Sequence, residues 1–221
     1  MSTLNRSTRS SLIALAAGLT LLGGTLAATS ISPSPQEETT KAESADASWK
    51  VDMVHSCAMF RVRHMGAGFF WGRFNDVTGS INFDPADPKT LGMDISIDVD
   101  SVDSGHPGLD KHLKSPDFFD SKEFPAMVFK SESALAKPTL KRADSPVHAW
   151  DVKGKLSIRG VTKEVTAHVM YWGAADLGRG NRAGFETTFD IKRSDFGIDY
   201  GVDQGSLGDM VKVTAAFEVT K

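Results

Sequence analysis

Three side chains that could ligate a metal ion lie close together in the sequence, namely His55, Cys57 and His64. His55 and Cys57 are two residues apart, so on a β-strand both would point to the same side. His64 is nine residues from His55 and would point to the opposite side. A zinc site needs three or four such ligands, and no third ligand is identifiable. We therefore expect no metal and no cofactor, and we interpret Cys57 as a buried or partly buried thiol.

Catalytic motifs are absent from the sequence. The segment from Gln204 to Gly208 approaches a nucleophile elbow, but its spacing is wrong for Gly-x-Ser-x-Gly. There is no Cys-x-x-Cys, no His-Glu-x-x-His and no phosphate-binding glycine loop between a strand and a helix. No nucleophile can be paired with a base, so we expect no catalytic residues and a protein that is not an enzyme. An enzyme that acts on a lipid is the weaker alternative.

Alternation of apolar and polar residues runs through the chain from Trp49 onward. Such alternation is typical of β-strands with one apolar and one solvated face. It predicts eight strands, at about 49–64, 69–83 with a kink at Asn75-Asp76, 91–100, from 126, 152–159, 165–171, 185–192 and 211–219. In the first strand we expect Val54, Ala58, Phe60 and Val62 on the inner face.

One segment, 108–125, breaks this alternation. Leu109 and Leu113 have helical spacing, and Ser115-Pro116 resembles the start of a second short helix. The segment also carries three phenylalanines, which must be buried against something. The open end of a barrel is the natural place for them.

Eight strands with one apolar face predict an antiparallel barrel or a β-sandwich. An eight-stranded barrel has room for its own side chains or for one ligand. Small residues at inward positions, Ala58, Gly154, Ala167 and Ala215, favour free space inside. We therefore predict an all-β fold, and the residues favour a barrel with a short helical insert over a sandwich.

The first 28 residues have the pattern of a secretory signal peptide. Arg6 and Arg9 precede an apolar stretch over 12–26, and small residues follow up to Ala28. An uncleaved anchor is the alternative, but the stretch is short and rich in glycine for a span of about 20 residues. We expect a periplasmic or extracellular protein with no stable membrane span after cleavage.

Residues 29–48 are predicted to be a disordered linker, because they combine prolines and acidic residues with little apolar surface. The folded domain then covers 49–221. Cleavage after Ala28 would change the formal net charge from −3 to −5, because only two arginines are lost. This acidity argues against nucleic acid as a partner. The single cysteine excludes an internal disulfide.

An ordered set of motifs resembles the YceI-like family, a group of bacterial lipocalin-like polyisoprenoid-binding proteins. The motifs extend over the whole predicted domain. They are Trp49-Lys50-Val51-Asp52 with His55 and His64, Gly72-Arg73-Phe74, the run from Asp110 to Asp120, Gly154-Lys155-Leu156 with Arg159-Gly160, and Arg193-Ser194-Asp195-Phe196-Gly197. The resemblance implies an all-β fold, an eight-stranded antiparallel lipocalin-like barrel with a short helical insert. It also implies an elongated apolar pocket for an isoprenoid or a similar amphiphilic lipid.

With this resemblance, the inward side chains become candidates for the pocket wall. They are Phe60, Val62, Phe74, Ile95, Ile97, Phe129, Leu156, Phe185, Phe189 and Phe217. The alternative is that they fill a solid core, in an envelope stress or interaction protein without a lipid ligand. The sequence leaves the oligomeric state open, a homodimer included.

Three polar residues are candidates for contact with a lipid head group such as a phosphate or a quinone. His64, His112 and Arg193 stand at predicted strand or helix ends within the matching motifs. For each of them a structural role is the competing interpretation, for example an ion pair between Arg193 and Asp195. The glycine-rich loop at 197–208 is either a connector or a movable flap over the barrel mouth.

Overall fold

The fold was analysed in a computed structural model that describes residues 48–85, 87, 91–139 and 145–221. The predicted signal peptide and, apart from Ser48, the predicted linker lie outside these residues.

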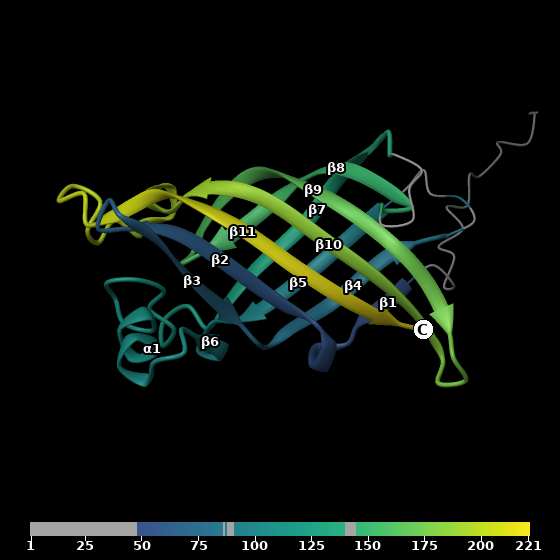
Figure 1. The fold of residues 1–221 in the computed structure, drawn as a ribbon, viewed down its shortest axis with the longest axis horizontal. Helices are drawn as coiled ribbons and strands as arrows, with labels where there is room; N and C mark the ends of the chain where they lie inside the picture. Colours follow the sequence, from purple (N-terminus) through teal and green to yellow (C-terminus); the bar gives the residue numbers. More distant parts are fainter. Residues whose placement is uncertain (1–47, 86, 88–90, 140–144) are drawn as a thin grey trace, which may run out of the picture. The chain divides into compact units, whose positions relative to one another are not determined.

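The described residues form one antiparallel sheet with short helices (Figure 1). The strands are β1 Ser48–Val51, β2 Cys57–His64, β3 Gly68–Phe74, β4 Val77–Phe83, β5 Leu91–Asp98, β6 Val102–Asp103, β7 Ala126–Lys137, β8 His148–Ile158, β9 Val161–Asp176, β10 Asn181–Lys192 and β11 Leu207–Thr220. The helix is α1 Pro107–Leu113, and the 3-10 turns are η1 Met53–His55, η2 Val99–Ser101 and η3 Arg193–Phe196.

The sheet closes on itself. Its strand order is β1-β4-β5-β7-β8-β9-β10-β11-β2-β3-β6, and β1 also pairs with β11. The pairs β1/β2, β3/β4 and β5/β6 each follow one another in the chain and form one bent strand. The result is the predicted eight-stranded antiparallel barrel, and the predicted kink at Asn75-Asp76 separates β3 from β4.

The first strand is interrupted where the alternation predicts continuity. The Asp52 carboxylate accepts a hydrogen bond from the Val54 N–H at 3.0 Å and thereby caps η1. The turn places Val54 outside, with 81% of its surface exposed. The inward assignment of Val54 is therefore wrong, because a capping carboxylate offers the backbone an alternative to the sheet ladder.

The insert before β7 contains one helix rather than two. Leu113 of α1 is buried, as its spacing with Leu109 predicts. After α1 the chain turns back: Phe119 N–H donates to the Leu113 carbonyl, and Asp120 has a positive φ of 50°. These bonds replace the helix predicted at Ser115-Pro116. No helix among the described residues is long and apolar enough to span a membrane.

One half of the interior is densely packed with aromatic rings. Phe83 lies at the centre, with its ring centroid 5.6 Å from Trp150, 4.7 Å from Tyr171 and 5.5 Å from Phe185. The Trp49 indole N–H donates to the Phe83 carbonyl at 3.0 Å, so its polar atom is paired within the core. These residues form the aromatic plug of the barrel.

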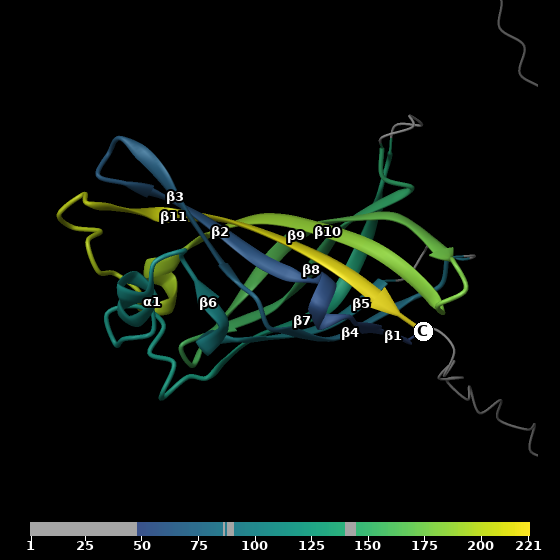
Figure 2. The same cartoon turned by 60° about the horizontal axis from the view of Figure 1, so that its bottom comes forward.

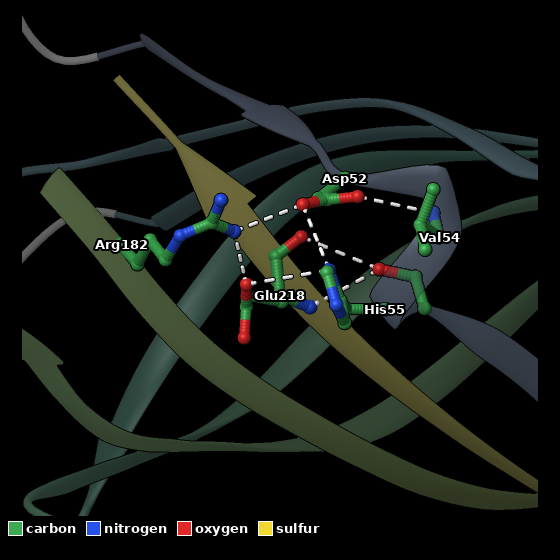
Figure 3. A network of polar contacts seen from close by, with 6 residues as sticks. Asp52, Val54, His55, Arg182 and Glu218 are labelled. Carbon is green, nitrogen blue, oxygen red and sulfur yellow. Dashed lines mark hydrogen bonds and ion pairs between the residues drawn. The ribbon is translucent and has the colours of Figure 1, made fainter. Parts of the chain in front are cut away.

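A polar network ties the strand ends where the barrel closes (Figure 3). Arg182 of β10 donates to Asp52, at 2.9 Å, and to Glu218 of β11. His55 Nδ1 lies 3.0 Å from an Asp52 oxygen and 3.7 Å from a Glu218 oxygen. Hydrogen bonds from His55 and Arg182 hold the pKa of Asp52 well below its usual range.

This network predicts an acid-sensitive contribution to stability. The unfolded Asp52 carboxylate takes up a proton near pH 4, whereas the folded one resists protonation, so its contribution is lost as the pH falls below about 4. We expect Asp52→Asn to lower the thermal midpoint at neutral pH and to flatten its decrease toward about pH 3. Circular dichroism melts measure both. Glu123→Gln, at an exposed position outside the network, serves as the control, and an equal change in both variants contradicts the prediction.

Candidate functional site

An apolar cavity of about 760 Å³ occupies the half of the barrel beyond the aromatic plug. Its wall comes from β2, β3, β5 and β7–β11, from the α1 insert, from η3 and from the segment that joins η3 to β11. Figure 2 shows α1 and the β2–β3 turn at the same end of the barrel. The six polar residues on the wall are His64, His112, Thr187, Arg193, Tyr200 and Ser206.

Nine of the ten candidate pocket residues lie on this wall, namely Phe60, Val62, Phe74, Ile95, Ile97, Phe129, Leu156, Phe189 and Phe217. Phe185 does not line the cavity. It packs into the aromatic plug, with its ring 5.2 Å from Tyr171. The solid core considered as an alternative therefore describes only one half of the interior.

The cavity exists because small side chains meet across neighbouring strands. Ala58 of β2 pairs with Ala215 of β11, which pairs in turn with Thr187 of β10. Ala167 of β9 also lines the wall. Short side chains at neighbouring inward positions leave the centre of the barrel unfilled.

Gly154 contributes no free space, contrary to the prediction. A Cβ atom there would lie 2.6 Å from Cζ of Phe129, so the Phe129 ring already occupies the position. Gly72 likewise makes room for an aromatic ring, because a Cβ atom built there would overlap the ring of Phe60. Glycine inside a strand marks such a close approach, and this signal at Gly72 was missed by the sequence analysis.

Thr187 is a second residue that the sequence analysis missed. It is 4% exposed, and its Oγ1 has no hydrogen-bond partner among the described residues. Its place between Phe185 and Phe189 in an alternating strand identifies it as inward-facing. Thr187 is paired with Ala215, so it adjoins the alanine band formed by Ala58, Ala167 and Ala215.

Arg193 lines the cavity but its guanidinium is used by the backbone. The side chain is 6% exposed and donates to the carbonyls of four residues, at 2.8–3.3 Å, which are Gly208, Ile198, Tyr200 and Leu207. Burial lowers the pKa of Arg193, and the nearby Asp209 and Asp199 charges oppose that shift. The predicted ion pair with Asp195 is replaced by these bonds, so Arg193 orders the rim of the cavity.

The two histidines lie at the same rim. His112 Nε2 is 2.9 Å from an Asp117 oxygen, and its ring is 5.1 Å from Tyr200 and 4.9 Å from Phe118. His64 is exposed at the end of β2. Tyr200 joins the histidines at the mouth, although no motif in the sequence identified it.

The polar groups of the wall are not arranged as a catalytic pair. The Ser206 hydroxyl donates to the Gly201 carbonyl at 3.3 Å, whereas His112 contacts Asp117. Nucleophilic catalysis needs a nucleophile within hydrogen-bond reach of its base. Among the described residues, Ser206 has no hydrogen bond to either histidine of the wall, and most of the wall is apolar.

His55 has different neighbours from those considered for a metal site. One ligand atom each of Asp52, His55 and Glu218 lie within 4.8 Å of one another. Cys57 is not among them. Arg182 already supplies a positive charge to both carboxylates, so the group functions as an ion-pair network that closes the barrel.

Comparison with known proteins identifies the family. Residues 49–219 match the YceI-like domain, and the chain belongs to this family. It is 38% identical over 168 residues to the UPF0312 protein of Pseudomonas fluorescens. The alignment covers 76% of this chain and 82% of the relative.

Solved structures share the fold. The crystal structure of Burkholderia cenocepacia BcnA aligns with a TM-score of 0.64 and 26% identity, over 77% of this chain and 99% of that protein. A polyisoprenoid-binding domain from Saccharophagus degradans aligns with a TM-score of 0.58 and 14% identity, over 79% of this chain and 98% of that domain. At this low identity, the second similarity concerns the fold alone.

Two buried alanines provide a test of the cavity. Ala167 lines it, whereas Ala183 is packed in the core beside the plug. We expect Ala183→Leu to lower the free energy of unfolding by about 1–3 kcal/mol through overpacking. Ala167→Leu should cost less than ~1 kcal/mol because the added atoms enter free space. Urea unfolding measures both, and equal losses would contradict the assignment of the cavity.

The buried guanidinium gives a second prediction. Arg193→Met should lower the free energy of unfolding by about 2–4 kcal/mol, because several buried carbonyls lose a charged donor. Arg159→Met is the matched control, since Arg159 donates to one carbonyl of the same segment, Gly197, through an exposed hydrogen bond. Its expected loss is below ~1 kcal/mol. A smaller effect at Arg193 than at Arg159 would rule out its role in ordering the rim.

Proposed function

We propose that this protein binds and carries the hydrocarbon chain of an isoprenoid lipid in the periplasm or outside the cell, without catalysis. The observation that carries the proposal is the apolar cavity of about 760 Å³ at one end of a barrel whose other end is plugged. Ligand pockets of small molecules typically measure about 300–1,000 Å³ and are mostly apolar. The compartment is proposed from the N-terminal sequence pattern.

Burial alone supplies the affinity. A chain that removes roughly 300 Å² of its apolar surface from water gains roughly 7 kcal/mol. Association costs reduce this gain, but no catalytic or cofactor group is needed. The phenylalanines and branched aliphatic side chains of the wall suit a methyl-branched chain. Membership in the YceI-like family and the shared fold of a polyisoprenoid-binding domain support this ligand class.

The rim of the cavity favours an anionic head group such as a phosphate. Arg193 carries a buried positive charge that contacts carbonyls rather than a carboxylate. The nearby Asp209 and Asp199 charges offset part of this charge, and burial leaves the remaining field at the rim weakly screened. His64 and His112 lie on the same wall and can donate hydrogen bonds to a phosphate. A quinone head, which would accept hydrogen bonds without a charge, is the alternative.

The test is direct analysis of the bound molecule. Solvent extraction of the purified protein followed by mass spectrometry should release an isoprenoid, and the emptied protein should take up added polyprenyl phosphate. We expect Ala215→Leu, in the alanine band, to reduce this uptake at least tenfold by filling the cavity. Ala183→Leu, outside the cavity, should retain it.

The outcomes separate the possibilities. Preparations that contain no lipid and take up neither polyprenol nor polyprenyl phosphate would contradict the proposal. Equal uptake of polyprenol and polyprenyl phosphate would retain the apolar pocket but exclude the anionic head-group preference.

A further inference from the structure

We propose that the outer face of the β2–β3 hairpin docks on a membrane surface that contains anionic phospholipids. The docking face, called here the hairpin patch, consists of Arg61, Arg63, Met65, Phe69 and Trp71. The biological purpose of docking rests on the proposed lipid-carrying function, because a carrier must meet the membrane that holds its ligand. The surface itself is argued from the structure.

The apolar side chains of the hairpin patch are exposed. Met65 is 65% exposed, and Phe69 and Trp71 are each 51% exposed. Arg63 pairs with Phe69 and Arg61 pairs with Trp71 across the two strands, so these side chains share one face of the hairpin. Tryptophan and arginine with apolar neighbours are suited to the interface between water and lipid.

The arginines of the hairpin patch are held by aromatic rings and not by acids. The Arg61 guanidinium carbon lies 4.1 Å from the Phe69 ring centroid and 5.6 Å from that of Trp71. Arg63 lies 5.6 Å from Phe69 and donates to the Gly66 carbonyl. Neither arginine has an ion pair within the described part of the chain. Neither β2 nor β3 contains an acidic residue.

Other positions on the outer surface of the barrel carry lysines that are paired with acids. Cross-strand ion pairs join Lys130 to Asp94, Lys155 to Glu132 and Lys212 to Asp190. The hairpin patch, by contrast, combines two arginines that have no ion pair among the described residues with aromatic side chains, in a chain whose formal net charge is −3. Guanidinium groups bind phosphate oxygens in a bidentate manner, so an anionic phospholipid surface is complementary in charge and in polarity.

The position of the hairpin patch connects it to the cavity. Met65 and Phe69 belong both to the patch and to the cavity wall, and His64 and Phe70 of the same hairpin also line the cavity. Figure 2 shows the β2–β3 turn standing clear of α1 at this end of the barrel. Beyond β2, β3 pairs with β6 only at Arg73 and Phe74, so the distal half of the hairpin is not covered by a further strand. Docking of the patch would bring the cavity mouth to the membrane.

The test is flotation of the purified protein with vesicles of phosphatidylcholine and phosphatidylglycerol, compared with vesicles of phosphatidylcholine alone. We expect binding to the anionic vesicles, and a decrease of at least tenfold in the partition coefficient for Arg61→Gln/Arg63→Gln. Lys50→Gln/Lys153→Gln removes the same charge from exposed positions outside the patch and should bind within about twofold of the unmodified protein. All variants are purified identically, so their N-terminal residues are the same.

A second pair of variants tests the aromatic part. Trp71→Ser should weaken binding to anionic vesicles severalfold, whereas Trp172→Ser, at a 43% exposed tryptophan of β9, should not. Tryptophan fluorescence should shift to the blue on vesicle binding in the unmodified protein and in Trp172→Ser, but not in Trp71→Ser.

Three results would overturn the inference: absence of binding to anionic vesicles, equal losses in the two charge variants, or self-association that disappears with Trp71→Ser. The last result would assign the patch to a second copy of this chain. Uptake of polyprenyl phosphate from detergent is measured on the same samples. Uptake without vesicle binding rejects the docking surface alone, and vesicle binding without uptake rejects the proposed function alone.

Discussion

Closure of the sheet is the constraint on which the rest of the structure depends. Because β1 pairs with both β4 and β11, the eight bent or straight strands have no free edge around the barrel body. Closure forces every second side chain of each strand into one shared interior. It also brings Asp52, His55, Arg182 and Glu218 together at the seam, although they are separated by up to 166 residues in the chain. The backbone ladder brings these strand ends into register, and the charged side chains then join them by ion pairs.

The sizes of the inward side chains then divide the interior. Aromatic rings converge at one end, where Phe83 contacts Trp150, Tyr171 and Phe185. Further along the barrel, alanines and Thr187 lie side by side on neighbouring strands, and the cavity begins there. A plug at one end gives the cavity a floor. On the proposed function, a bound chain would enter and leave through the end that carries α1 and the β2–β3 turn.

That end is organised by side chains in place of a sheet ladder. Arg193 replaces backbone pairing in the glycine-rich segment by donating to four carbonyls. Its charge is consequently fixed at the cavity rim. The β2–β3 hairpin contributes to this end in two ways. Because side chains alternate along its strands, its inner face lines the cavity and its outer face carries arginine and aromatic residues. The proposed binding of a lipid chain and the proposed membrane contact therefore both involve this hairpin.

The sequence by itself determined the strands, their hairpin order, the inner face of nearly every strand and the family, because alternation and ordered motifs are local or linear signals. It did not distinguish Phe185 from Phe189, which have the same periodicity but lie in the plug and on the cavity wall. The position of each ring depends on the side chains that face it across the barrel, and these come from strands far away in the sequence. For the same reason, the partners of Arg193, up to 15 residues away, and the exposure of Val54 were decided only by the tertiary structure.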